Sequence, residues 1–123
     1  MRVVTFSAGV EAIIGIALIV DPSLVASLLL GTGLSSGGQA VGRVAGFALL
    51  SLGAACWPLL DPKGRATAAV RGLLIYNALA AIFFLYVGIS REFMGVLLWP
   101  AAALHAILAI LFARIFVVNK RNT

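Results

Sequence analysis

The stretch FMGVLLWPAAALHAILAILFARIFVV, residues 93–118, determines how this chain folds. It contains a single charged residue, Arg114, near its end. About 20 apolar residues in an α-helix cross the hydrocarbon core of a membrane, so a run of this length predicts a transmembrane helix. The rest of the chain contains three more runs of the same kind.

These further apolar runs cover residues 3–20, 39–60 and 67–88, and each contains one charged residue. No segment shows the alternation of polar and apolar residues that indicates a half-buried β-strand. The sequence therefore predicts an all-α fold, an integral membrane four-helix bundle that occupies residues 1–123 as a single domain.

The composition also indicates a membrane protein. Of the 123 residues, 63% are apolar and 11% are charged, whereas soluble domains average about 45–50% apolar and about 25% charged residues. A chain this short cannot bury so much apolar surface in its own interior. These figures exclude a soluble globular domain, a disordered tail and a nucleic-acid-binding protein, although the formal net charge is +5.

The segment DPSLVASLLL, residues 21–30, is helical in pattern but too short to span a membrane. Asp21 is a typical N-cap, Pro22 suits the first helical position, and Gly31 is a stop signal. We expect a short helix over residues 22–30, between the first and second spans, that lies at the membrane interface or folds back over the bundle. The alternative is an extension of the first span beyond a proline kink.

The distribution of basic residues predicts the orientation, because Lys and Arg are enriched in the cytoplasmic loops of membrane proteins. With four spans and the N-terminus inside, seven basic residues lie on the inner side and two on the outer side. Both termini are therefore expected in the cytoplasm, with Trp57 near the inner interface and Trp99 near the outer one. The inner residues are Arg2, Lys63, Arg65, Arg71, Arg114, Lys120 and Arg121, and the outer ones are Arg43 and Arg91.

One polar side chain from each span is expected near the middle of the membrane. At about 1.5 Å per helical residue, the central positions of a core about 30 Å thick are Glu11, Ser51, Asn77 and His105. Arg43 is nearer the outer face, but its long side chain reaches inward, so it is a second candidate to pair with Glu11. Intramembrane charges are costly unless paired, which makes this layer a candidate ligand or proton site. The alternative is that the layer only holds the helices together.

Small residues flank this layer at helical spacing. Small residues four positions apart allow membrane helices to approach closely, so these faces are expected to point into the bundle. The pattern G-x-x-x-G at 42–46 is also a helix-dimerisation pattern. The expected helix-packing positions are Gly15, Gly42, Gly46, Gly53, Ala102 and Ala106.

The sequence provides little for covalent or metal chemistry. Cys56 is the one cysteine and His105 the one histidine, so no disulfide and no Cys/His zinc site forms within one chain. A bis-histidine haem requires a histidine from a second chain. We predict no catalytic residue, no metal and no resident cofactor; a quinone, a lipid or haem is the alternative, with aromatic residues such as Tyr76 and Phe84 bordering a quinone or lipid.

Four stretches carry a resemblance to a known family, and they read EAIIGIALIVDP (11–22), GRVAGFALLSLG (42–53), GLLIYN (72–77) and WPAAALH (99–105). They are similar to small bacterial membrane proteins with four spans, of the DoxX-like kind. The resemblance covers most of the chain and implies a four-helix bundle in the bacterial inner membrane, without implying a reaction. A weaker resemblance, to small multidrug transporters, rests on the size, the four spans and the lone Glu11 in the first span, but their third-helix motif with Gly and Trp is absent.

The sequence favours an accessory or structural subunit that binds laterally to a larger membrane complex, because the chain has neither a sizeable soluble domain nor a nucleophile, metal or nucleotide motif. The partners are then membrane lipids and other membrane subunits or a second copy. The alternative is a proton-coupled small transporter, or a protein that binds a lipophilic ligand such as a quinone or lipid, using Glu11. By analogy with DoxX-like proteins, a redox or quinone-linked membrane enzyme is a third hypothesis.

Overall fold

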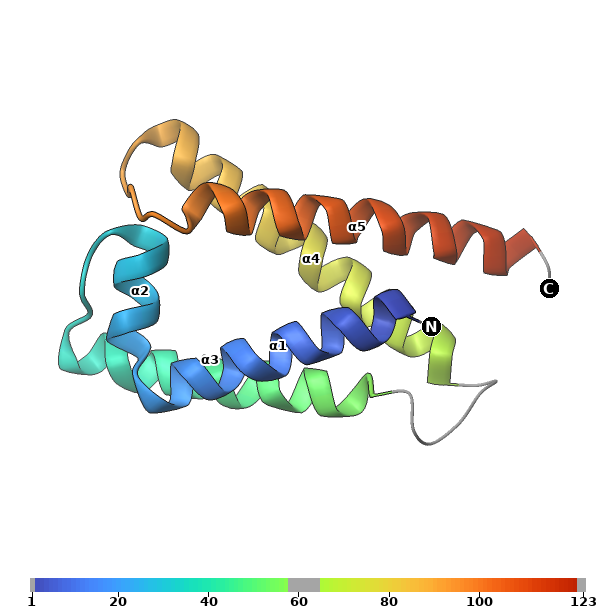
Figure 1. Cartoon of the computed structure of the whole chain (residues 1–123), viewed down its shortest axis with the longest axis horizontal. Helices are drawn as coiled ribbons and strands as arrows, with labels where there is room; N and C mark the ends of the chain where they lie inside the picture. Colours follow the sequence, from blue (N-terminus) through green and yellow to red (C-terminus); the bar gives the residue numbers. More distant parts are fainter. Residues whose placement is uncertain (1, 58–64, 122–123) are drawn as a thin grey trace.

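The computed structural model describes residues 2–57 and 65–121, and all the regular elements in these ranges are α-helices. The all-α prediction is therefore confirmed for the described part of the chain (Figure 1). The helices are α1 (Arg2–Val20), α2 (Pro22–Leu30), α3 (Ser36–Ala55), α4 (Arg65–Ser90) and α5 (Leu98–Arg121).

Three of these helices, α1, α4 and α5, are long and apolar enough to cross a membrane, as expected for a multi-pass membrane protein. The fourth long helix, α3, has 20 residues, about 30 Å at 1.5 Å per residue. It is less apolar than the others because it contains Gln39, Arg43 and several glycines. The run predicted over 39–60 ends at residues 58–60, which lie outside the described residues.

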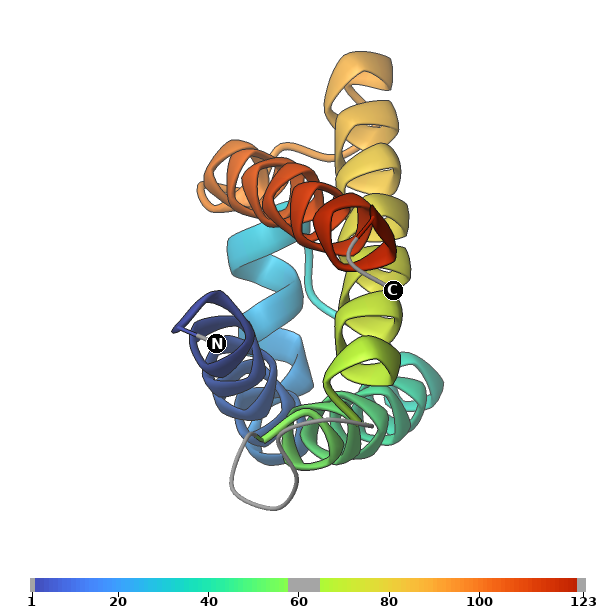
Figure 2. The ribbon, with the colours of Figure 1, turned by 90° about the vertical axis from the view of Figure 1, so that its right-hand side faces the viewer.

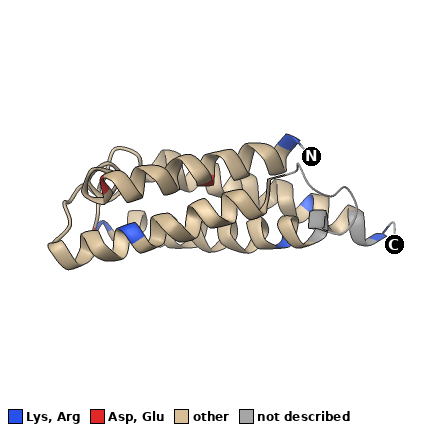
Figure 3. Cartoon of the chain, turned by 90° about the horizontal axis from the view of Figure 1, so that it is seen from below, with Lys and Arg blue, Asp and Glu red and all other residues tan. Residues whose placement is uncertain are grey.

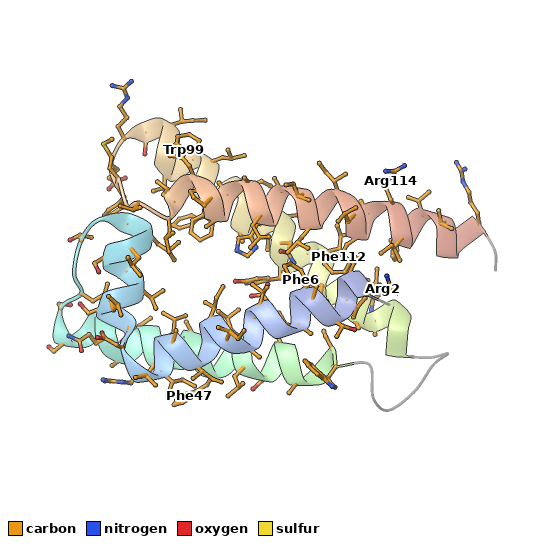
Figure 4. The ribbon with its side chains drawn as sticks, viewed as in Figure 1. Arg2, Phe6, Phe47, Trp99, Phe112 and Arg114 are labelled. Atoms are coloured by element: carbon orange, nitrogen blue, oxygen red, sulfur yellow. The ribbon has the colours of Figure 1, made fainter. Side chains whose placement is uncertain are left out.

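The long helices form two antiparallel hairpins, α1 with α3 and α4 with α5 (Figure 1). Contacts within each hairpin are extensive, whereas the two hairpins touch at few places. They meet at an apolar cluster near the start of α1, where Phe112 of α5 is completely buried and points between the hairpins (Figure 4). The buried members of this cluster are Val4, Ala8, Cys56, Val70, Leu73, Leu108 and Phe112.

Helices α1 and α3 pack with almost no side chain between them. A Cβ atom on Gly46 would lie 2.7 Å from the Gly15 carbonyl oxygen, and one on Gly53 would lie 2.7 Å from the Ala8 carbonyl oxygen. Both distances are too short for any side chain, so only glycine allows this approach. Three of the expected packing glycines thus line the α1–α3 contact within one chain.

The other three expected packing positions lie elsewhere. Gly42 faces the side chain of Pro22 at the start of α2, where its own Cβ would be 2.6 Å from that of the proline. In α5, Ala102 is buried and Ala106 is half-buried.

Helix α2 is a separate element rather than an extension of α1. The side chain of Asp21 accepts a hydrogen bond from the Leu24 backbone N–H at 2.9 Å and so caps the helix, and Pro22 occupies its first turn. At the other end Gly31 adopts φ 74°, a left-handed conformation that favours glycine. Helix α2 consequently turns away from α1 and runs across the long axis of the molecule at one end (Figures 1 and 2).

Helix α5 begins at Leu98, five residues later than the predicted start at 93. The intervening backbone binds α2 instead: the Met94 N–H donates to the Leu30 carbonyl at 3.1 Å, and the Leu97 N–H donates to the Leu28 carbonyl at 2.8 Å. Carbonyls in the last turn of a helix lack partners within the helix. The segment 91–97 supplies those partners and thereby ties the second hairpin to the first.

Candidate functional site

Glu11 lies in the middle of α1 with its side chain completely buried. Neither carboxyl oxygen has a hydrogen-bond partner, although the Tyr76 side chain of α4 faces the carboxyl group and interacts with it at a looser geometry. A buried polar group without a hydrogen bond is costly, and an ionised one costs more. Most polar groups inside folded proteins are paired, so this unpaired carboxyl group requires an explanation.

A hydrogen-bonded cluster next to Glu11 joins the two hairpins. Asn77 of α4 is completely buried, and its Nδ2 donates to the Leu73 carbonyl at 2.8 Å and lies 3.5 Å from the Oγ of Ser7 in α1. Its Oδ1 lies 2.8 Å from Nδ1 of His105 in α5, which is also buried. One asparagine therefore connects three helices.

This geometry determines which atoms donate. The Leu73 carbonyl only accepts, so the Asn77 nitrogen points toward it and the Asn77 oxygen points toward His105. Because the Asn77 oxygen only accepts, Nδ1 of His105 carries the proton. In a neutral imidazole the other nitrogen, Nε2, is then an acceptor.

Two aromatic rings of α4 pack against His105. The Tyr76 ring meets it edge-on, with ring centroids 5.7 Å apart, and the Phe84 ring lies at 5.6 Å with a tilt of 34°. These contacts fix the plane of the imidazole, since aromatic pairs prefer such edge-on or tilted arrangements. The polar cluster is thus bordered by the rings of Tyr76 and Phe84 as well as by the Glu11 carboxyl group.

Three of the residues predicted for the central layer, Glu11, Asn77 and His105, come together in this buried cluster. Asn77 does not donate to Glu11, because its amide nitrogen donates to the Leu73 carbonyl and approaches the Ser7 hydroxyl. His105 likewise does not pair with Glu11 in the structure; it binds Asn77 instead.

Ser51 and Arg43 lie apart from the cluster. Ser51 is exposed and its hydroxyl donates to the Phe47 carbonyl of its own helix at 2.8 Å. Arg43 is exposed as well, and its Nε donates to the Ile19 carbonyl at 3.2 Å, near the end of α1. A pair between Glu11 and Arg43 is therefore not formed, because Glu11 lies eight residues, about 12 Å, further back along α1.

Two members of the cluster were not predicted as polar site residues. Ser7 lies one turn before Glu11 on the same helix face and is completely buried. Tyr76 was considered only as an aromatic neighbour of a ligand. Ser7 could have been predicted from the sequence, because its spacing of four residues from Glu11 places both on one face of a helix.

The described residues do not include a group of three or more His, Cys, Asp or Glu side chains that would hold a metal ion. Comparisons of the chain with protein-family models, with curated proteins and with solved structures found no match. The relationship to DoxX-like proteins therefore stays a prediction.

Proposed function

We propose that the chain is a four-span protein of the bacterial inner membrane, with α1, α3, α4 and α5 as spans and both termini in the cytoplasm. The start of α1, the end of α3, the start of α4 and the end of α5 lie at one end of the molecule (Figure 1). Most of the described basic residues lie toward that end (Figure 3). By the helix bounds, Arg2 lies at the start of α1, Arg71 lies in the first part of α4, and Arg114 and Arg121 lie in the last part of α5. This is the pattern of a cytoplasmic side.

In this orientation α2 would lie along the outer surface of the membrane, because it runs across the long axis at the opposite end (Figure 1). Its exposed Leu24 and Leu28 would face lipid, while Pro22 and Ala26 are buried against the bundle. Interfacial helices lie in this way, with an apolar face at the boundary of the acyl chains.

We further propose that the protein binds a small lipophilic ligand in exchange for a proton at Glu11. The observation that carries this proposal is that both carboxyl oxygens are buried and unpaired. A carboxyl group in such a place is stable only when it is neutral or when a bound partner compensates its charge. Switching between these two conditions couples a proton to a ligand.

The titratable groups that interact with the Glu11 carboxyl group come from α3 and α4. Tyr76 belongs to α4, and Cys56, at the end of α3, lies in the apolar cluster close enough to interact with Glu11. His105 of α5 packs on the Tyr76 ring and bonds to Asn77 rather than to Glu11. Neither Tyr76 nor Cys56 is a cation that would hold Glu11 ionised. Proton exchange at this site is therefore attributed to Glu11 itself.

The test compares the purified protein with Glu11→Gln, which keeps the shape and removes the charge. We expect a small lipophilic molecule in solvent extracts of the wild-type protein, and its loss from the variant. We also expect dicyclohexylcarbodiimide, which reacts with protonated carboxyl groups in apolar surroundings, to modify Glu11. The exposed Glu92→Gln variant is the matched control and keeps both signals. Identical extracts and an unmodified Glu11 would contradict the proposal.

The accessory subunit is the second candidate function. The observation in its favour is that the long helices expose large apolar side chains, including Phe83 and Tyr86 on α4. Lipid covers such faces as well as a protein partner does, so this observation is less specific than the buried carboxyl group. Mild solubilisation followed by cross-linking tests this function, which requires a constant protein partner; a protein that always migrates alone contradicts it.

A further inference from the structure

We propose that the exposed face of α5, close to its end, binds an anionic phospholipid, and that Arg114 pairs with the phosphate group of this lipid. The inference rests on the proposed placement of α5 as a membrane span, but it does not involve Glu11 or its ligand. It follows from the depth of Arg114 in the span, from its lack of a partner among the described residues, and from a hollow beside it.

Arg114 lies inside the candidate span of α5 rather than beyond its end. The span runs from Leu98 to Val118, and its 21 residues measure about 31 Å at 1.5 Å per residue, which matches a hydrocarbon core of about 30 Å. Arg114 comes four residues before Val118, so its backbone is about 6 Å inside the boundary of the core. Helical side chains lean toward the N-terminus of their helix. In α5 this lean takes the guanidinium group away from the cytoplasmic boundary.

Arg114 faces away from the other helices. Phe112, which is completely buried in the apolar cluster, marks the packed face of α5. At about 100° per residue, Arg114 is about 160° from Phe112 around the helix. Figure 4 shows Arg114 on the side of α5 that points away from the first hairpin. Because Arg114 is also exposed, its neighbours in a membrane would be lipid molecules.

The guanidinium group of Arg114 has no hydrogen-bond or ion-pair partner among the described residues. The described acidic residues lie elsewhere: Glu11 is buried in the middle of α1, and Asp21 and Glu92 lie toward the opposite end of the molecule. A charged group at membrane depth is costly unless it is paired. A guanidinium group pairs well with phosphate, because two of its N–H groups donate in parallel. The phosphate of a neighbouring lipid would therefore compensate the charge that no described residue compensates.

A shallow hollow of about 340 Å³ lies beside Arg114 on the surface of α5. Its lining includes Ala113, Val117 and Val118 as well as Arg114. Small-molecule sites measure about 300–1,000 Å³, so the hollow is large enough to hold part of a lipid. Apart from the guanidinium group these side chains are apolar, which suits the first part of an acyl chain next to a phosphate held by Arg114.

A second arginine on this face favours an anionic lipid over a zwitterionic one. Arg121 is exposed at the end of α5. It follows Arg114 by seven residues, about two helical turns, so both project from nearly the same side. Basic residues at a cytoplasmic membrane surface attract anionic lipids by about 1 kcal/mol each. A zwitterionic headgroup would bring its own cation close to Arg121, whereas an anionic headgroup would not.

The experiment titrates the delipidated protein in detergent with two lipids that have the same acyl chains: phosphatidylglycerol, which is anionic, and phosphatidylcholine, which is zwitterionic. Native mass spectrometry counts the bound lipid molecules and gives a Kd for each lipid. We expect the first phosphatidylglycerol to bind at least about fivefold more tightly, which corresponds to the ~1 kcal/mol of one basic residue. Equal affinities would overturn the proposal, and this comparison requires no variant.

Variants then assign the preference to the hollow. Arg114→Gln removes the charge, and Val117→Trp fills the hollow without changing any charge; both should lower the affinity for phosphatidylglycerol to that for phosphatidylcholine. Arg71→Gln is the matched control, because it removes an exposed arginine at the same end of the molecule but from α4. It should retain the preference. An equal loss in Arg71→Gln, or no loss in Val117→Trp, would attribute the binding to overall charge and overturn the site.

The failure of this proposal is distinguishable from the failure of the proposed function. If alkaline carbonate releases the protein from bacterial membranes, α5 is not a span and the proposed membrane placement is wrong. A protein that stays in the membrane but shows no lipid preference would refute only the Arg114 site. A protein chain of constant mass that is lost from Arg114→Gln would assign this face to a partner subunit and would also overturn the lipid site.

Discussion

Asn77 organises the buried cluster because an amide donates and accepts at the same time. It binds its own helix through Leu73 and the facing helix through His105, and its nitrogen approaches Ser7 of α1. An apolar residue at this position could serve neither partner, and a hydroxyl has only one donor, whereas the Asn77 nitrogen contacts both Leu73 and Ser7. The cluster is thus held by one residue, while Glu11 beside it is left without a bond.

The tautomer of His105 is the first consequence that an experiment can test. Because the Asn77 oxygen accepts from Nδ1, nitrogen-15 NMR of labelled protein at neutral pH should show a protonated Nδ1 and an unprotonated Nε2. The Asn77→Ala variant should lose this preference, and the destabilisation should be about 1–3 kcal/mol because a buried donor loses its partner. A spectrum with the proton on Nε2 in the wild-type protein would refute the assignment of Asn77.

The depth of a residue in a span follows from the sequence, but the direction in which it points does not. Counting residues placed Glu11, Asn77 and Ser51 at one level, and the structure brings the first two together. Ser51 is exposed because α3 turns its glycines toward α1. At about 100° per residue, Ser51 is about 140° from Gly46 around the helix. Which face of α3 packs is decided by tertiary contacts that no pattern within one span reveals.

The α1–α3 hairpin depends on backbone contact along its glycines. Gly46→Ala should destabilise the protein by about 1–3 kcal/mol, the usual cost of overpacking, because the added Cβ would lie 2.7 Å from the Gly15 carbonyl oxygen and 2.9 Å from Ile19. Gly9→Ala is the matched control, since nothing lies within 4 Å of its Cβ. It should be neutral or stabilising by up to about 1 kcal/mol. Thermal unfolding in detergent measures both, and equal effects would contradict the glycine contact.

The segment between α4 and α5 packs closely on α2 at Gly95. A Cβ on Gly95 would collide with the backbone of Leu28 and Leu29, in the last turn of α2. Gly95→Ala should therefore break the hydrogen bonds that Met94 and Leu97 donate to α2. Hydrogen exchange of the peptide that contains these amides should become at least about tenfold faster, which corresponds to about 1.4 kcal/mol. Gly37→Ala, which meets nothing within 4 Å, should leave the rate unchanged.

The predicted start of α5 at 93 was early because residues 93–97 are apolar, and apolarity alone does not separate a span from a loop that packs on another helix. Gly95 and the turn before it were the available signals, but the partner of this segment, α2, is more than 60 residues away in the sequence. Contacts between residues so far apart in the sequence form only in the folded chain, so a local sequence pattern does not predict them. The later start still leaves 21 residues of α5 as a candidate span, from Leu98 to Val118.

In the whole molecule, the two helical hairpins are held together at both ends and between the ends. The hairpins are joined at one end by the contact of α2 with residues 94–97 and at the other by the apolar cluster around Phe112. The polar cluster bonds them between these two places. A ligand that enters at Glu11 would therefore act on both hairpins at once.

The orientation of the molecule is the prediction on which the direction of any exchange depends. Single cysteines at Met94, which is 76% exposed, and at Trp57, which is 44% exposed, mark the two ends without altering any charged residue. Replacing the buried Cys56 by alanine removes the background thiol. A membrane-impermeant maleimide added to intact cells should label Met94→Cys and spare Trp57→Cys until the membrane is opened, because the basic ends of the helices stay in the cytoplasm. The reverse pattern would place the termini outside, and a proton released from Glu11 would then have to be assigned to the opposite compartment.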